Sequence, residues 1–505
     1  MLKTKAARAV LGILLLATGV ILTFHASKRY TEKRYIVDAG TCRLDVLSTE
    51  RADLTPAEEH DSVLLFHGIA GNKIVMEFLA RSFAEMGMHV YTPDLPGHGR
   101  SSGPFSPDQA AACSLSLARG LAARGLIYPQ HTILAGHSMG GAIAMLVAQQ
   151  FRPAGVVAIS PAPMVAANGV IDANLLFHQQ AKLTPNTLVM VGELEPKWLT
   201  ANAAALVASS PAQDVKFERL KWNSHVSILF SHAAAREAQK WAAHALHLPE
   251  KDWAFPSRSN MLGTLLGFFG ILLLAGPFLH EMVGKEPQEE PRPANLPSAL
   301  MMIFECAVAS LVAMVVLRFW VPLRFLHLFE GDYLASFFLI VGGLLLLVHA
   351  RLARKQFPVK AAYLLPAAFA ALVLHVLVTG WFELTITGAW MTLQRWARFP
   401  VFFLAAFVFL YALESLLGPA TLARHRIVQM LVLIATCWLV LAAGVLYFKS
   451  GEILLALLAM YFGLAFFFTC VGAQLVRRLT GSATAAAVFG AILVAGFCLA
   501  LFPLS

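Results

Sequence analysis

Long apolar segments dominate the second half of this chain and restrict the folds open to it. Residues 261–505 hold eight such runs, and one more lies near the N-terminus. A helix needs about 20 apolar residues to cross a bilayer, and each run approaches that length. The segments are 9–24, 261–280, 299–321, 333–350, 361–380, 400–417, 427–448, 453–476 and 485–502. We therefore expect an uncleaved signal-anchor helix within residues 1–28 and an all-α, multi-span membrane domain at 255–505.

The region between the first two apolar segments has a different composition. The whole chain is 58% hydrophobic and 14% charged, whereas residues 30–250 carry charges, prolines and turn residues throughout. This composition is typical of a globular domain outside the membrane. The expected strands are 34–47 (a strand or a hairpin), 62–66, 89–92, 131–135, 155–159, 188–191 and 215–220, and the expected helices are 78–86, 108–123, 142–150 and 233–246. Strands that alternate with helices predict an α/β domain, with a mainly parallel sheet and helices on both faces.

One pentapeptide of this domain indicates nucleophilic chemistry. Gly136-His137-Ser138-Met139-Gly140 lies between an expected strand and an expected helix, the context in which G-x-S-x-G forms a nucleophile elbow. Such a turn strains the serine backbone and exposes the hydroxyl at the N-terminus of a helix. Glycines are expected on both sides because a Cβ atom there would collide with the neighbouring strand and helix. The alternative interpretation is a glycine-rich packing turn.

A serine hydroxyl needs a general base, and an acid that orients the base, to attack at neutral pH. In a parallel sheet of this kind the acid and then the histidine follow the serine along the chain, at the carboxyl ends of later strands. Glu193 and Glu195 follow the expected strand 188–191, and His225 follows the expected strand 215–220. These side chains are therefore the candidates to complete a catalytic group with Ser138.

Three motifs together resemble the α/β-hydrolase superfamily, and most closely its monoacylglycerol-lipase-like and serine-aminopeptidase-like branch. They are Phe66-His67-Gly68, the sequence DLPGHGRSSG at 94–103, and the elbow around Ser138. Their order and spacing match over about residues 40–248, and they are much more specific for the fold than for a substrate. The resemblance implies an α/β-hydrolase fold for this region, fused to a membrane domain that resembles no family we can name.

The resemblance also implies a catalytic triad and an oxyanion hole. Ser138 matches the nucleophile and His225 the general base, while the backbone N–H groups of Met139 and Ile69 match the oxyanion donors. The family usually has aspartate in a G-x-x-D segment at the acid position, and this chain has Glu195 there. The alternatives for the acid are Glu193, Asp172 and Asp214. We expect His67 and His98 to shape the site, Asp94 to fix its own loop, and His232 to be exposed.

These residues predict a membrane-anchored serine hydrolase that forms an acyl-enzyme. We expect it to cleave an ester or thioester of a lipid or acylated molecule that the bilayer delivers. Fewer than 30 residues separate the expected strands 155–159 and 188–191, which leaves little room for a lid. The alternatives are a serine peptidase, or a transporter or sensor that uses the α/β domain as a binding or regulatory module. We expect no cofactor and no metal ion, because no histidine pair has ligand spacing on a shared element.

The net charge of +9 does not indicate a nucleic-acid partner, because most cations flank the apolar segments. The positive-inside rule accounts for cations at such places. One side of a nine-helix arrangement, shared with the N-terminus, holds Lys285, Arg292, Arg351, Arg354, Lys355, Lys360, Arg424, Arg426, Arg477 and Arg478. The opposite side holds Arg318, Arg324, Arg395, Arg398 and Lys449, and Lys28, Arg29, Lys33 and Arg34 add to it. Within the C-terminal half, the first side has more cations than the opposite side. This excess places the N-terminus in the cytoplasm and the α/β domain on the extracytoplasmic side.

Further sequence features bear on the compartment and on the membrane half. The chain has no N-x-S/T sequon, which favours a bacterial plasma membrane over a eukaryotic lumen. Cys42 and Cys113 lie in the α/β region without metal-ligand spacing.

The ionisable residues inside apolar segments are Glu305, His349, His375 and Glu414. Such residues are costly in a membrane, so they are either functional, at the interface, or bonded to a neighbouring helix. Residues 381–399, rich in tryptophan, read as an interfacial segment.

Overall fold

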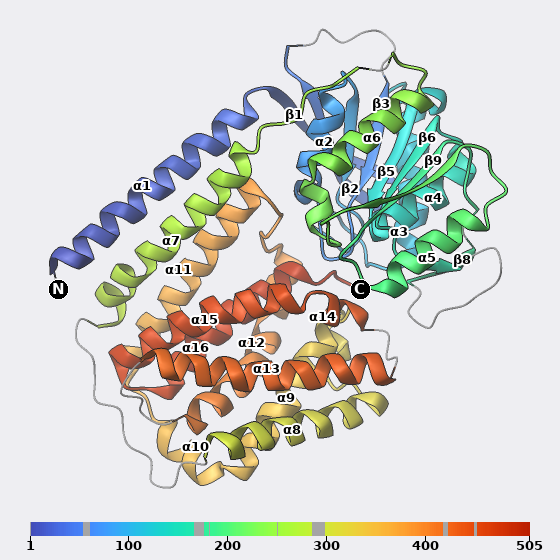
Figure 1. Cartoon of the computed structure of the whole chain (residues 1–505). Helices are drawn as coiled ribbons and strands as arrows, with labels where there is room; N and C mark the ends of the chain where they lie inside the picture. Colours follow the sequence, from blue (N-terminus) through green and yellow to red (C-terminus); the bar gives the residue numbers. More distant parts are fainter. Residues whose placement is uncertain are drawn as a thin grey trace. The chain divides into compact units, whose positions relative to one another are not determined.

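The computed structural model describes residues 2–53, 61–165, 176–180, 182–249, 251–284, 298–417, 423–448 and 452–505. The chain divides into two compact units (Figure 1). The sheet unit comprises Val20–Thr264, Phe382–Gly388 and Pro503–Ser505, and the helical unit comprises Met1–Gly19, Leu265–Trp381 and Ala389–Phe502. The sheet unit therefore includes two short segments from the C-terminal half, whereas the expected domains were continuous. Asp172, Lys285, Arg292 and Lys449 lie outside the described residues.

An eight-stranded, mainly parallel sheet forms the centre of the sheet unit (Figure 1). In order across the sheet, its strands are β1 (Tyr30–Ala39), β2 (Cys42–Arg51), β4 (His89–Pro93), β3 (Ser62–Phe66), β5 (Thr132–His137), β6 (Gly155–Ile159), β9 (Thr187–Gly192) and β10 (Val215–Leu220). The hairpin of β1 and β2 is antiparallel, and β2 pairs antiparallel with β4. The strands from β4 to β10 run parallel. Every residue of β3, β5, β6 and β9 is buried, which explains their continuous apolar sequences.

Helices cover both faces of this sheet, as expected. On one face α2 (Glu77–Ala84) packs against α6 (His232–Ala245), and on the other α3 (Pro107–Ala123) packs against α4 (Met139–Phe151). Smaller elements complete the unit: α5 (Lys197–Ala208), η1 (Lys73–Met76), η2 (Pro129–His131), η3 (Ser227–Phe230) and the two-stranded sheet of β7 (Met164–Val165) and β8 (Phe177–Gln180). In the sheet, β4 lies on one side of β3 and β5 lies on the other, so the direction in which strands are added reverses after β4. This reversal is a topological switch point at the carboxyl ends of β3 and β5, where Ile69 and Ser138 follow.

The helical unit is built from long apolar helices. Among the described residues, nine helices are long and apolar enough to cross a membrane, and each expected apolar segment overlaps one of them. The helices of the C-terminal half are α7 (Ser259–Val283), α8 (Ala299–Phe319), α9 (Gly331–Val348), α10 (Ala350–Gln356), α11 (Ala361–Thr385), α12 (Leu393–Leu416), α13 (Ala423–Phe448), α14 (Ile453–Leu457), α15 (Ala459–Thr480) and α16 (Ala483–Leu501), and η4 (Arg324–Leu326) precedes α9. The N-terminal segment is α1 (Leu2–Ser27). Inside the unit, α16 packs against α12 and α15, and α12 packs against α9.

Ionisable side chains inside the helical unit are paired. Glu305 on α8 lies 2.8 Å from Nε2 of His349. Glu414 on α12 accepts a hydrogen bond from Arg477 on α15 at 2.8 Å, and both side chains are almost completely buried. His375 packs edge-to-face against Trp396, with 6.1 Å between ring centroids. The structure thus gives Glu305, His349 and Glu414 partners within the protein.

The segment 381–399 contains the turn between two long helices. Helix α11 continues to Thr385 and α12 begins at Leu393. Residues Phe382–Gly388, which include the last turn of α11, belong to the sheet unit. The position of this segment at a membrane interface stays a prediction.

Candidate active site

Ser138 stands on the sharp turn between β5 and α4. Its backbone has φ 53° and ψ −118°, a conformation that side-chain-bearing residues rarely adopt. A Cβ atom on Gly136 would lie 2.2 Å from the carbonyl oxygen of Gly140, and one on Gly140 would lie 2.2 Å from that of Phe66. Both glycines are therefore required by close backbone approach, for the physical reason that the motif suggested. The turn places Ser138 at the first turn of α4, where the helix dipole favours negative charge.

The structure brings Ser138, His225 and Glu195 into one hydrogen-bonded chain. Nε2 of His225 lies 3.0 Å from Oγ of Ser138, and Nδ1 of His225 lies 3.0 Å from Oε2 of Glu195. A carboxylate accepts hydrogen bonds, so Nδ1 carries the proton and Nε2 is left to accept the serine proton. The Glu195 side chain is fully buried, while the His225 side chain is 18% exposed. The arrangement has the nucleophile–base–acid geometry of a serine hydrolase.

The other candidate acids lie elsewhere. Oε2 of Glu193 accepts a hydrogen bond from the backbone N–H of Trp222 at 3.2 Å and does not contact His225. Asp214 precedes β10 and therefore lies at the amino end of the strand, opposite the edge that carries His225. Asp172 is outside the described residues. Of the described candidates, Glu195 is the one that the fold places against His225.

Three further groups hold the base and the acid, and sequence reasoning did not find them. Oε1 of Glu195 accepts hydrogen bonds from the Gly192 backbone N–H at 2.6 Å and from the Ser160 hydroxyl. Nε2 of His137 donates to the backbone carbonyl of His225 at 2.7 Å. Burial holds the pKa of His137 well below its ordinary value, so its ring stays neutral and keeps this donor role. Ser160 directly follows β6, so its place at the carboxyl end of a strand was an available signal.

Met139 and Ile69 carry the two backbone N–H groups that the sequence predicted as oxyanion donors. Met139 is the first residue of α4, and Ile69 follows His67-Gly68 at the end of β3. Neither N–H donates a hydrogen bond within the described part of the chain. A Cβ atom on Gly68 would lie 3.1 Å from that of Ser138, which places this loop directly beside the nucleophile. Unpaired donors on either side of a strained serine are what stabilisation of a tetrahedral intermediate requires.

We call residues 67–73 the oxyanion loop, and two histidines, His67 and His98, connect it to its surroundings. Nε2 of His67 accepts from the Leu95 backbone N–H at 2.9 Å. Nε2 of His98 accepts from the Ala70 backbone N–H at 3.3 Å. Burial lowers the pKa of His67 to about 4, so its acceptor role persists at neutral pH. Both histidines therefore connect this loop to the segment after β4, as loop-shaping residues would.

Asp94 fixes the same two segments and has no contact with Ser138. One carboxylate oxygen accepts from the Lys73 backbone N–H at 2.9 Å, and the other accepts from the Lys73 ammonium group and from the Arg100 backbone N–H.

His232 lies exposed at the start of α6, stacked on Phe255 with 4.5 Å between ring centroids. Among the described residues, no cluster of three His, Cys, Asp or Glu side chains has the geometry of a metal site.

Comparison with known proteins identifies the family of the sheet-containing region. The sequence model of the α/β hydrolase family matches residues 63–262. This part of the chain is an α/β-hydrolase domain. The match ends within α7, and the α/β-hydrolase domain thus accounts for the sheet and the candidate triad but not for the rest of the helical half.

Individual relatives match the α/β-hydrolase domain over shorter stretches. Lipase 1 of Psychrobacter immobilis is 39% identical over 92 residues, which cover 18% of this chain and 28% of that protein. The mouse sn-1-specific diacylglycerol lipase ABHD11 is 34% identical over 132 residues, covering 24% of this chain and 41% of its own. The matched stretches thus span less than half of either relative.

Solved structures also align with this domain. A butyrate-bound esterase, Est2 of Thermogutta terrifontis, gives a TM-score of 0.36 at 13% identity and covers 44% of this chain and 96% of its own. The esterase Est1E of Butyrivibrio proteoclasticus with bound ferulic acid gives 0.35 at 15% identity, covering 42% of this chain and 99% of its own.

Proposed function

We propose that this protein is a membrane-anchored serine hydrolase that cleaves esters or thioesters of lipids or acylated molecules. The observation that carries the proposal is the continuous hydrogen-bonded chain from Ser138 through His225 to Glu195. It lies in an α/β-hydrolase domain whose relatives include proteins named lipases. We therefore propose Ser138 as nucleophile, His225 as general base and Glu195 as the acid, with the N–H groups of Met139 and Ile69 as oxyanion donors.

The geometry supports the following reaction. Nε2 of His225 takes the proton of Ser138 as Oγ attacks the acyl carbon, and Glu195 stabilises the imidazolium that forms. The N–H groups of Met139 and Ile69 then stabilise the negative charge on the former carbonyl oxygen. His225 returns the proton to the leaving alcohol or thiol, which departs and leaves an acyl group on Ser138. Water, deprotonated by the same histidine, releases the acid and restores the hydroxyl.

The surface beside the proposed triad supports a lipid or acylated substrate. Leu194 is 59% exposed and Trp222 is 82% exposed, and they flank the loops that carry Glu195 and His225. The backbone N–H of Leu194 donates to the carbonyl of Asn223, so the two loops are joined. Trp222 also has φ 59°, an unusual conformation for a bulky residue. Its side chain buries little surface within the protein, and we propose that this apolar rim contacts the lipid surface that holds the substrate.

A disulfide supports an extracytoplasmic position for the domain. Cys42 and Cys113 are bonded although 71 residues separate them in sequence. Disulfides persist in oxidising compartments and are rare in a reducing cytoplasm. We propose that the nine apolar helices place the protein in a bacterial plasma membrane with the α/β-hydrolase domain on the outer side, as the distribution of cations also suggests.

Activity-based labelling tests the proposal. A fluorophosphonate that cannot cross the plasma membrane is added to intact spheroplasts that produce the full-length protein or its Ser138→Ala variant. We expect the wild type to be labelled and the variant to be unlabelled at equal abundance. If labelling requires detergent, the serine is activated but the proposed orientation is wrong. If the folded wild type is unlabelled even in detergent, the hydrolase proposal fails, and a binding or regulatory module becomes the better interpretation.

A further inference from the structure

A short segment of the C-terminal half contacts the oxyanion loop. Residues Phe382–Gly388, which we call the clamp segment, belong to the sheet unit although α11 and α12 on either side belong mainly to the helical unit. The side-chain amide of Asn72 donates to Oγ1 of Thr387 and to the carbonyl oxygen of Gly388, each at 3.0 Å. Asn72 is 4% exposed, so these bonds are shielded from water. More than 300 residues separate the partners in sequence, so no local turn requirement explains the contact.

Asn72 has a second role that makes its position important. Its side-chain oxygen accepts from the backbone N–H of Ile74 at 3.0 Å and caps η1. The same side chain therefore fixes the end of the oxyanion loop and attaches it to the clamp segment. Ile69 lies three residues earlier in this loop, and Ala70 between them has φ 58°. A loop with such a backbone keeps its conformation only where its surroundings hold it.

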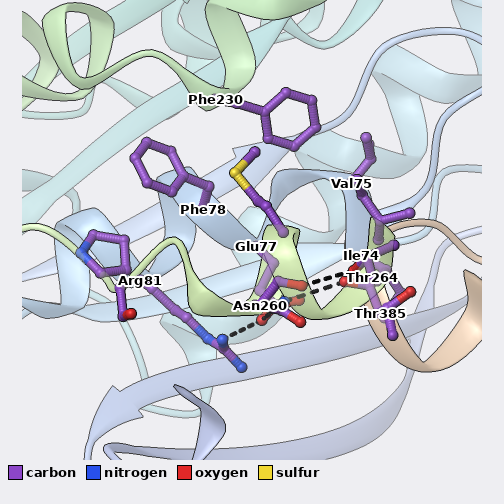
Figure 2. A pocket seen from close by; sticks show the side chains of 13 residues that line it. Ile74, Val75, Glu77, Phe78, Arg81, Phe230, Asn260, Thr264 and Thr385 are labelled. Atoms are coloured by element: carbon purple, nitrogen blue, oxygen red, sulfur yellow. Dashed lines mark hydrogen bonds and ion pairs between the residues drawn. The ribbon is translucent and has the colours of Figure 1, made fainter. Parts of the chain in front are cut away.

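Two other contacts hold the clamp segment itself. Asn260, in the first turn of α7, donates through its side-chain amide to the carbonyl oxygen of Thr385 at 3.2 Å and to Oε1 of Glu77 at 3.1 Å. Figure 2 shows Asn260 between Glu77 and Thr385, with Arg81 on the other side of the Glu77 carboxylate. Glu383 pairs with Arg100 at 2.9 Å. Because the Arg100 side chain is 39% exposed, this ion pair contributes less to the attachment than the buried amide bonds.

A second segment of the C-terminal half contacts the neighbouring loop. The backbone of Leu504 pairs with that of Gly97 and Phe105, through N–H···O bonds of 2.9 and 2.6 Å. Gly97 precedes His98, whose ring accepts the N–H of Ala70. The clamp segment holds the oxyanion loop directly, through Asn72, whereas Leu504 acts one step further away.

We propose that the clamp segment positions the oxyanion hole, with Asn72 as the positioning residue that transmits the contact to the N–H of Ile69. The inference rests on the proposed hydrolase function. It gives part of the C-terminal half a role in the chemical step, in addition to anchoring. A displaced donor weakens stabilisation of the transition state more than binding of the substrate, because the charge that it stabilises forms only during the reaction.

Two substitutions separate the clamp contact from the rest of the loop. Asn72→Ser keeps an oxygen that can cap η1 but is too short to reach Thr387 and Gly388. Thr387→Val removes one of the two acceptors, the Thr387 hydroxyl, while the carbonyl of Gly388 remains, and it leaves the sequence of the oxyanion loop unchanged. The matched control is Thr436→Val, because Thr436 on α13 is half-buried and its hydroxyl bonds within its own helix to the carbonyl of Val432. All variants are made in the full-length protein, reconstituted in lipid nanodiscs.

We expect Asn72→Ser and Thr387→Val each to lower kcat roughly tenfold, as a small misplacement of a catalytic group does. KM should stay within about twofold, because bound substrate does not yet carry the oxyanion charge. The inhibition constant of an alkylboronic acid, which mimics the tetrahedral intermediate, should rise by the same factor as kcat falls. The double variant should be no worse than Asn72→Ser alone, because the bond lost in Thr387→Val is one of the two that Asn72→Ser already removes.

Hydrogen–deuterium exchange makes the result independent of activity. We expect the peptide that spans the oxyanion loop to exchange faster in Thr387→Val and at the wild-type rate in Thr436→Val. Unchanged exchange and unchanged kcat in Thr387→Val would overturn the inference, as would a rise in KM with constant kcat. If the wild type hydrolyses no ester while loop exchange still responds to Thr387→Val, the proposed function fails and the structural coupling stands.

Discussion

The sheet unit and the helical unit each contain a buried glutamate that contacts a basic side chain. The basic partner is a histidine in the sheet unit and an arginine in the helical unit. Glu195 in the sheet unit is fully buried and contacts His225, whose ring is 18% exposed. Glu414 in the helical unit is 1% exposed and contacts Arg477, which is 2% exposed. An imidazole can take up and release a proton near neutral pH, whereas a guanidinium stays charged. In the proposed mechanism the glutamate of the sheet unit supports proton transfer, whereas Glu414 in the helical unit forms a fixed ion pair.

The comparison predicts its largest effect at Glu195. Glu195→Gln should lower kcat by about 10³- to 10⁴-fold, because an amide no longer selects the tautomer of His225 that leaves Nε2 free. Glu193→Gln is the matched control and should retain near-wild-type turnover. Ester hydrolysis by the two variants, with thermal unfolding recorded for each, measures the difference. Loss of activity in Glu193→Gln with retention in Glu195→Gln would mean that the acid is misassigned.

The corresponding change in the helical unit should affect stability rather than turnover. Glu414→Gln removes the carboxylate charge that lies 2.8 Å from the buried guanidinium of Arg477 and 3.5 Å from that of Arg426. Breaking a buried pair in this way typically costs about 3–5 kcal/mol. Thermal unfolding in nanodiscs should show the loss, and Glu414→Gln combined with Arg477→Met should recover part of it. A fall in kcat at a temperature where the variant is folded would contradict this distinction between the two glutamates, because Glu414 would then contribute to the reaction.

The smallest effect is expected at the apolar rim beside the proposed triad. Trp222→Asn keeps a residue that tolerates positive φ, and combined with Leu194→Ser it removes the exposed apolar surface. We expect a fall of about tenfold in kcat/KM for a bilayer-resident ester, since burying two such side chains is worth a few kcal/mol at most. A water-soluble short-chain ester should be cleaved at the wild-type rate. Leu126→Ser, at an exposed position before β5, is the control, and equal losses on both substrates would contradict a role in contact with lipid.

The sequence predicted the sheet unit well because its signals are local. The elbow at Ser138 needs glycines at fixed offsets, and the buried strands need continuous apolar residues, so both can be recognised within a few positions. The position of Glu195 three residues after Gly192 is also local, and the structure places its carboxylate on the Gly192 N–H. The order of the parallel strands then brings the ends of distant strands to one edge without further information.

Contacts between distant segments were not predicted. The Cys42–Cys113 bond joins β2 to α3, and neither cysteine has a neighbouring residue that reveals the pairing. The hydrogen bonds of Asn72 to residues 387 and 388 depend on the path of α11, which hydropathy cannot give. The same limit applies to Glu414 and Arg477, since a hydrophobic pattern reports that a helix is apolar but not which neighbour it meets. The resemblance was informative for the α/β-hydrolase domain because that region has motifs, and the helical unit offered none.

The pairing of Leu504 with Gly97 has a consequence for how the protein is made. The two residues are 407 positions apart (504 minus 97), yet their backbones are joined by a 2.9 Å hydrogen bond. A ribosome that adds about 5–20 residues per second needs roughly 20–80 s to cover that distance. During this interval the nascent sheet already contains Ser138 and its histidines, but the loop at Gly97 still lacks its hydrogen-bond partner Leu504. Synthesis of the long apolar helices therefore delays completion of this loop until the ribosome has passed codon 504.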